Sequence, residues 1–127
     1  MCEEIFELVE AHGETHDQLF IWLPNQKAIL PGDNYYQAFP NLYTIRGTTP
    51  RPVRAWIASL DEMRKLEPEY IVPSHTGPII GKDEVAKQLT DYRDGITWVY
   101  VETIRVRMYV CISVCRHAMT SCCPACY

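Results

Sequence analysis

The chain has 127 residues, of which 47% are hydrophobic and 22% charged, and this length and composition predict one globular domain at most. Its net charge is −4 and no run of lysines or arginines occurs, which excludes nucleic acid as an expected partner because phosphate contacts need clustered positive charge. No apolar stretch reaches about 18 residues, so we expect no membrane span, and the acidic start at Glu3-Glu4 argues against a signal peptide. We therefore expect a soluble protein, of unknown compartment.

Three strands are predicted in the first third of the chain, over residues 3–10, 19–23 and 27–30. A polar turn rich in potential ligands separates the first two strands, and Pro31-Gly32-Asp33-Asn34 ends the third. Residues 35–51 are aromatic and polar without a clear period, which is typical of a functional or mobile segment.

Two helices and a short strand follow. Apolar residues at helical spacing predict a helix over 51–66, and a similar pattern predicts a second helix over 83–100. Residues 70–72 form a predicted strand with the loop 73–78 at its carboxyl end. Binding groups in α/β proteins collect after strands, so the polar loops are the places to search for a site.

Three loop segments carry a specific resemblance: Gly13-Glu14-Thr15, Pro31-Gly32-Asp33-Asn34 and Pro73-Ser74-His75-Thr76. Their order and context resemble the second half of a metallo-β-lactamase fold. With Asn41-Leu42-Tyr43-Thr44-Ile45-Arg46-Gly47 and Arg51, they resemble the alkyl sulfatases of that superfamily, from about residue 7 to residue 105. The resemblance implies an α/β fold that is the C-terminal half of an αββα sandwich, incomplete in this chain.

The resemblance also implies roles for individual residues. Glu14 would be a ligand of one zinc, Asp33 would bridge two zincs, and His75 would be the last ligand of the second zinc. A bridging carboxylate can hold two cations and lower the pKa of a water that they share. Sulfate would be held by a separate polar segment, in which arginine offers a planar fork of donors to the oxyanion. That segment comprises Asn41, Thr44, Arg46 and Arg51.

The implied activity is a zinc-dependent hydrolysis of a small-molecule sulfate ester to an alcohol and inorganic sulfate. Enzymes of the superfamily need a His-x-His-x-Asp-His motif, which supplies most ligands of the first zinc. This chain has four histidines, and no two of them are separated by one residue. We therefore expect half a site for two zinc ions, with no activity from this chain by itself.

Other readings stay open at this point. The chain could be another metallo-β-lactamase-fold hydrolase, acting on a phosphoester or thioester, or a non-catalytic fragment that pairs with a full-length subunit. The Asn-x-x-Thr-x-Arg segment favours the sulfatase reading over the thioesterase one. His12 and His16 match no ligand of the family and are interpreted as surface or supporting residues. Four aromatic residues either line an apolar groove for an alkyl chain or pack their loop: Tyr35, Tyr36, Phe39 and Tyr43.

The end of the chain differs in composition, and we predict a partial metallo-β-lactamase-like domain over 1–105 followed by a cysteine-rich tail over 106–127. Five of the six cysteines lie in the last 17 residues. Our hypothesis is an unstructured tail from a truncated gene model. The alternative is a zinc or disulfide cluster, formed by Cys111, Cys115, His117, Cys122, Cys123 and Cys126.

Relatives continue beyond the matched segment into a helical dimerisation domain, so the resemblance suggests a homodimer formed through a region that this chain lacks. Half of a two-layered sandwich also exposes a sheet edge and an apolar sheet face. We therefore expect the isolated chain to aggregate or to be only partly ordered.

Overall fold

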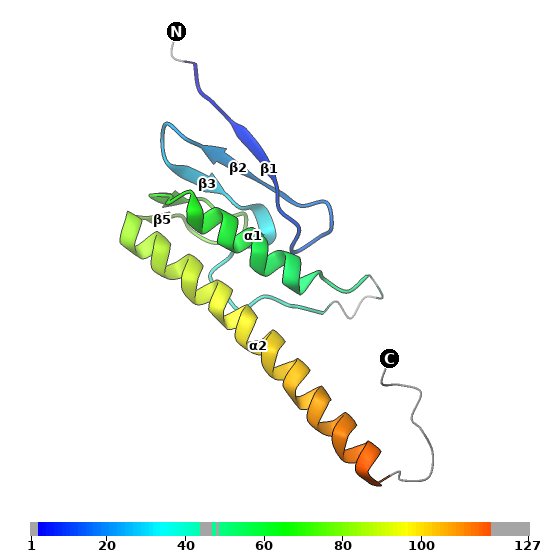
Figure 1. Ribbon diagram of the computed structural model, residues 1–127. Coiled ribbons are helices and arrows are strands. Elements are labelled where there is room, and N and C mark those ends of the chain that lie inside the picture. The colour runs from blue at the N-terminus through cyan, green and yellow to red at the C-terminus, as the bar shows by residue number, and fades with distance from the viewer. Residues whose placement is uncertain (1–2, 44–46, 48, 118–127) are drawn as a thin grey trace. The chain divides into compact units, whose positions relative to one another are not determined.

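The computed structural model describes residues 3–43, 47 and 49–117. The chain forms two compact units, residues 1–96 and 97–127. The elements in chain order are strands β1 (Glu7–Glu10), β2 (Leu19–Leu23) and β3 (Ala28–Leu30), the short 3-10 helix η1 (Gly32–Asn34), helix α1 (Val53–Lys65), strands β4 (Tyr70–Ile71) and β5 (Ile79–Ile80), and helix α2 (Lys82–His117) (Figure 1).

The five strands form one sheet in the order β1-β2-β3-β4-β5. β1, β2 and β3 pair antiparallel, β3 and β4 pair parallel, and β5 returns antiparallel to β4. Ile29 is central to this register, because it lies opposite Trp22 on one side and Ile71 on the other. The parallel β3–β4 pair brings two loops to one edge of the sheet, since both strands end there.

The core of residues 1–96 lies between the sheet and two helices, which cover the same face of the sheet (Figure 1). Side chains alternate along β2, so Phe20 and Trp22 point into the core while Ile21 between them does not. The same core includes Ile29 and Ile71 from the sheet, Trp56, Leu60 and Met63 from α1, and Leu89 and Ile96 from α2.

The opposite face of the sheet is also apolar. Leu8, Leu19, Tyr70, Val72 and Ile80 are between 41% and 68% exposed, and they alternate with or follow residues that face the core. A sheet that is apolar on both faces is typical of a layered α/β architecture with cover on both sides. This face is therefore the one that a second layer of a sandwich would cover.

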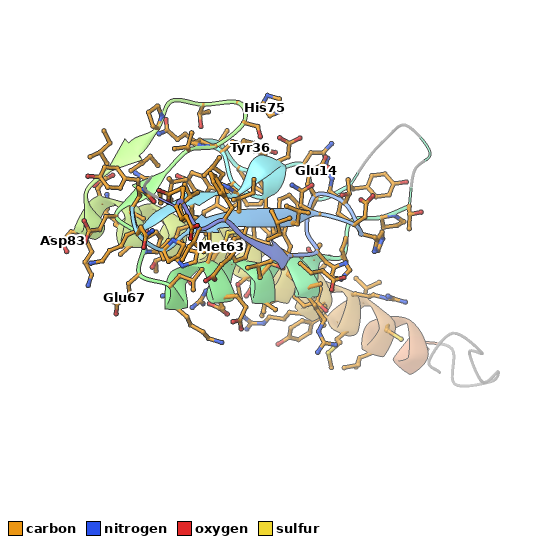
Figure 2. The ribbon with its side chains drawn as sticks, turned by 90° about the horizontal axis from the view of Figure 1, so that it is seen from above. Glu14, Tyr36, Met63, Glu67, His75 and Asp83 are labelled. Atoms are coloured by element: carbon orange, nitrogen blue, oxygen red, sulfur yellow. The ribbon has the colours of Figure 1, made fainter. Side chains whose placement is uncertain are left out.

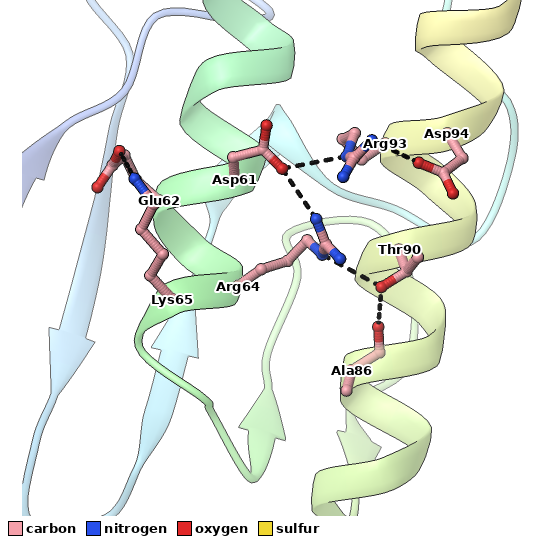
Figure 3. Close-up of polar contacts among 8 residues, drawn as sticks. All are labelled: Asp61, Glu62, Arg64, Lys65, Ala86, Thr90, Arg93 and Asp94. Atoms are coloured by element: carbon pink, nitrogen blue, oxygen red, sulfur yellow. Dashed lines mark hydrogen bonds and ion pairs between the residues drawn. The ribbon is translucent and has the colours of Figure 1, made fainter.

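Polar contacts join α1 to the beginning of α2 (Figure 3). Asp61 accepts from Arg64 at 2.9 Å and forms an ion pair with Arg93, whose Nε lies 3.1 Å from Oδ1 of Asp61. Nε of Arg64 donates to the hydroxyl of Thr90 at 3.1 Å, and that hydroxyl donates to the carbonyl of Ala86 at 2.7 Å. Partly exposed ion pairs add little stability individually, so these contacts supplement the apolar packing of the two helices.

Several elements differ from the sequence prediction in extent. β2 was predicted with its observed bounds, whereas β1 and β3 are shorter at their beginnings. β5 was not predicted, because two residues after a proline are too few to show a period. None of the helices in the described ranges combines the length and apolarity that crossing a bilayer requires.

The largest difference concerns the end of the chain. The unstructured tail predicted from residue 106 is wrong for residues 106–117, which continue α2. Extending an existing helix costs far less than nucleating one, so β-branched residues with strand-like alternation can be accommodated there. The predicted boundary at 105/106 falls inside α2. Of the tail cysteines, Cys111 and Cys115 lie in α2, while Cys122, Cys123 and Cys126 lie outside the described residues.

Candidate functional site

Two predicted metal ligands, Asp33 and His75, meet at the carboxyl ends of β3 and β4. Asp33 lies in η1 directly after β3, and His75 lies in the loop after β4. Oδ1 of Asp33 is 3.1 Å from Nε2 of His75, although the two residues are far apart in the sequence. Their side chains are 39% and 68% exposed, so both remain accessible to a ligand. Figure 2 shows His75 on the loop at the top of the view.

The third predicted ligand, Glu14, is bound to Arg51 instead. Its carboxylate forms an ion pair with the guanidinium of Arg51, which also donates to the carbonyl of Asn41. Both side chains are largely buried, at 21% and 12% exposed, and the guanidinium lies 5.7 Å from the ring centre of Trp56. Glu14 and Arg51, predicted as a zinc ligand and a sulfate contact, are therefore partners of each other in this structure.

Asn34 connects the loop of Glu14 to the turn of Asp33, a role that was not predicted from the sequence. It is fully buried. Its side-chain amide donates to the carbonyl of Ala11 at 2.6 Å, and its side-chain oxygen accepts from the backbone amide of Glu14 at 2.9 Å. Its own carbonyl accepts from the indole of Trp56 at 2.9 Å. Because burial of an asparagine cannot be read from a turn motif, the sequence contained no signal for this contact set.

Gly13 is required by the same packing. A Cβ atom at this position would lie 2.3 Å from Oδ1 of Asn34 and 2.8 Å from Cδ1 of Trp56, closer than real side chains approach. The hydroxyl of Ser59 in α1 also connects this loop to the helix, because it donates to the carbonyl of His12 at 2.8 Å. The loop before Glu14 is thus held against both η1 and α1.

The remaining predicted site residues are less well connected. The side chain of Asn41 is exposed and accepts from the backbone amide of Tyr43 at 3.1 Å, as in a local turn. Thr44 and Arg46 lie outside the described residues. His12 contacts Glu10 at 2.8 Å and His16 is exposed, in agreement with their interpretation as surface or supporting residues.

These residues fit a zinc site only in part. Asp33 and His75 offer one oxygen and one nitrogen, which are ligand types that zinc accepts, but a zinc site takes four ligands. In the part of the chain that the structure describes, no three His, Cys, Asp or Glu side chains gather where they could hold one ion. The carboxylate of Glu14 would first have to leave Arg51. The described residues therefore do not supply a complete set of zinc ligands.

An aromatic groove of about 470 Å³ lies beside these loops. We call it the tyrosine groove; its lining includes Tyr35, Tyr36, Phe39, Gln88, Asp91 and Tyr92. The ring of Tyr92 lies 4.9 Å from that of Tyr35 and 6.1 Å from that of Tyr36, between centres. Tyr35 is almost completely buried and Tyr43 is not part of the lining, so the four aromatic residues of this segment divide between packing and groove.

Two tyrosines of the groove are held in the protonated form. Burial, together with the negative charges of Glu84 and Asp91, raises the pKa of Tyr35 to about 12. Burial also raises the pKa of Tyr92, and its hydroxyl has no hydrogen-bond partner among the described residues. The groove therefore presents neutral tyrosine rings.

Comparison with known proteins gives consistent results. Residues 3–75 match the model of the metallo-β-lactamase superfamily. The chain is 29% identical over 100 residues to a linear primary-alkylsulfatase of a Pseudomonas species, which covers 78% of this chain and 19% of that protein. It is 32% identical over 85 residues to an (R)-specific secondary-alkylsulfatase of Pseudomonas, covering 65% of this chain and 13% of that protein.

Among solved structures, the stereoselective inverting sec-alkylsulfatase Pisa1 from Pseudomonas superposes with a TM-score of 0.73. The superposition covers 84% of this chain and 18% of that chain, at 24% identity, and so concerns the fold alone. The chain spans a fifth or less of the length of these relatives.

Proposed function

The chain belongs to the metallo-β-lactamase superfamily and its curated relatives are alkylsulfatases, and on this premise we propose that it carries one half of the site of a zinc-dependent sulfate-ester hydrolase. The reaction would convert a sulfate ester and water into an alcohol and inorganic sulfate. Zinc, the substrate class and the reaction are all part of the proposal.

The contact between Asp33 and His75 is the observation that carries the proposal. Two ligand-type side chains from separate loops meet at 3.1 Å at the carboxyl ends of adjacent parallel strands, where α/β folds place their binding groups. Neither residue is buried, so neither contributes to a core. A pairing of this kind is better explained by ligand binding than by stability, because exposed ion pairs stabilise a fold little.

Glu14 and Arg51 would act in the same site with exchanged partners. We propose that Glu14 is the third ligand and that Arg51 turns from Glu14 to the sulfate, with Asn41, Thr44 and Arg46 as further sulfate contacts. Arginine suits this role because its fork of donors matches a tetrahedral oxyanion.

The chain by itself would be inactive, because three ligands divided between two zinc ions hold neither of them firmly. The remaining ligands would come from a polypeptide that carries the His-x-His-x-Asp-His motif. Homodimerisation, which the resemblance suggested, stays a prediction.

The test combines metal analysis with an assay of sulfate release. The 127-residue chain is dialysed against limiting zinc, and its zinc content and its release of sulfate from dodecyl sulfate are measured. The measurement is repeated after mixing with the part of the Pseudomonas linear primary-alkylsulfatase that precedes its matched segment. We expect weak, substoichiometric zinc and no sulfate release from the chain alone, and gain of both in the mixture.

Variants identify the residues responsible. Asp33→Asn and His75→Ala should abolish the gain in the mixture, whereas the control His16→Ala, which changes an exposed histidine, should leave it intact. Two firmly bound zinc ions in the isolated chain would contradict the half-site. Hydrolysis of a phosphoester or thioester in preference to the sulfate ester would support the alternative reading of the chain.

A further inference from the structure

The tyrosine groove combines aromatic rings with negative charge. Tyr36 and Tyr92 are half-buried and inclined to each other by 69°, so they form two walls of different orientation, and Phe39 adds an exposed ring. Tyr35 lies beneath them, at 59° to Tyr92. Rings at such angles surround a rounded group better than they clasp a flat one.

The charged side chain in the lining of the groove is acidic, although the guanidinium of Arg51 also acts electrostatically on Tyr92. Asp91 is an exposed carboxylate in its lining, and no lysine or arginine occurs among the described residues that line it. Glu84 lies one helical turn before Gln88, and Gln88 hydrogen-bonds both Glu84, at 2.7 Å, and the hydroxyl of Tyr35, at 3.3 Å. The negative charge of Glu84 therefore reaches the floor of the groove.

Aromatic faces and a nearby carboxylate are the features that recognise organic cations, because the ring quadrupole and the carboxylate both attract positive charge. A plain alkyl chain would pack against the aromatic rings but would not pair with the carboxylate of Asp91. Charge complementarity therefore favours a positively charged, rounded, apolar group.

We propose that the tyrosine groove binds the quaternary ammonium group of a zwitterionic sulfate ester. This inference rests on the proposed function for the sulfate end of that substrate. The groove and the candidate metal ligands are adjacent: the backbone amide of Gln37, which lines the groove, donates to the hydroxyl of Thr76 at 3.4 Å, and Thr76 follows His75. With its cation in the groove, the proposed substrate would direct its sulfate toward the loop that carries Thr76 and His75.

The test measures binding of choline to the complete 127-residue chain by equilibrium dialysis, which tolerates self-association. Its uncharged carbon isostere, with a tert-butyl group in place of trimethylammonium, is the competitor. We expect saturable choline binding, and competition by the isostere at least about tenfold weaker than by unlabelled choline. Equal competition by the two compounds, or no saturable binding, would overturn the proposal.

Three variants locate the interaction. Asp91→Asn keeps the shape of the side chain and should weaken choline binding at least about threefold, while the control Asp94→Asn, outside the groove lining on the same helix, should not change it. Tyr36→Leu should weaken binding of choline but not of the isostere, and circular dichroism verifies that each variant is folded. Equal effects of Asp91→Asn and Asp94→Asn would contradict a specific site.

The outcome is separate from that of the proposed function, because choline binding requires neither zinc nor hydrolysis. Loss of sulfate release with choline binding retained would reject the proposed function alone. Sulfate release from dodecyl sulfate without choline binding would reject the groove assignment alone.

Discussion

Asn34 holds together the loops that carry two of the candidate ligands. With both polar ends of its side chain used inside the core, it fixes the distance between the backbone of Glu14 and that of Asp33. Neighbouring Asp33, by contrast, is exposed and meets His75. Adjacent residues of one turn thus have different roles: the buried Asn34 supports the loops, and the exposed Asp33 is accessible to a ligand.

Asn34→Ala should lower the free energy of unfolding by about 2–4 kcal/mol, because it leaves the carbonyl of Ala11 and the amide of Glu14 buried without partners. Urea unfolding followed by tryptophan fluorescence measures the change. The matched control is Asn25→Ala, which alters an exposed asparagine in the turn before β3 and should change stability by less than about 0.5 kcal/mol. Similar losses for both variants would show that the buried hydrogen bonds of Asn34 contribute nothing particular.

The ion pair of Glu14 and Arg51 likewise depends on contacts that only the folded chain creates. A sequence motif names residue types and their order, but it does not say which partner a charge will choose. In the structure, the guanidinium of Arg51 pairs with the carboxylate of Glu14 and lies over the ring of Trp56. Both residues can serve the proposed site only if a ligand replaces this pairing.

Among the elements, the turn between β5 and α2 depends on a conformation that favours glycine. Gly81 has φ of +109°, and its backbone both donates to the carbonyl of Glu69 and accepts from the amide of Val85, each at 2.9 Å. The backbone of this one residue therefore hydrogen-bonds to the residue before β4 and to the first turn of α2. A side chain at this position would meet no steric obstacle, since no atom lies within 4 Å of a Cβ placed there. The requirement for glycine therefore comes from the positive φ of the backbone alone.

Gly81→Ala should consequently destabilise the protein by about 1–2 kcal/mol, through strain at positive φ and not through a clash. Gly77→Ala is the control, because Gly77 also has open space around it and lacks positive φ. Thermal unfolding of the two variants gives the comparison. A control that loses as much stability as Gly81→Ala would assign the effect to the loop as a whole.

At the scale of the whole molecule, exposed apolar surface is the dominant feature of the sheet. The face away from the helices carries Leu19 and Val72 at 42% and 45% exposed, and β1 is an unpaired edge of the sheet. Such surfaces promote association with other chains. We therefore expect self-association to occur through this face of the sheet and through the edge strand β1.

We predict that Leu19→Thr with Val72→Thr reduces self-association of the chain, measured by sedimentation velocity across a concentration series. The expected result is a shift toward monomer with an unchanged circular dichroism spectrum, because neither residue is buried. Val101→Thr with Ile104→Thr is the control: these residues of α2 are 50% and 42% exposed, so the polarity change is matched. A stronger shift toward monomer in the control would place the associating surface on the helix.

Much of the architecture could be predicted from local pattern. The apolar run Leu19 to Leu23, followed by a turn, and the helical period of Val53 to Met63 predicted the observed strand and helix, and the matching family model confirmed the metallo-β-lactamase fold. The extension of α2 beyond residue 100 was missed, because the pattern of residues 106–115 alternates as a strand would. A helix already formed can override such a pattern, since each added residue gains a hydrogen bond at low cost.

The sequence alone determined the class of fold, the residue types of the candidate ligands and the absence of the histidine motif, because these depend on composition and on order along the chain. Only the tertiary structure decided that Asp33 meets His75, that Glu14 pairs with Arg51 and that Tyr36 and Tyr92 wall a groove with Asp91. These contacts join residues far apart in sequence. They depend on the parallel pairing of β3 with β4 and on the packing of both helices against the sheet, which no local period encodes.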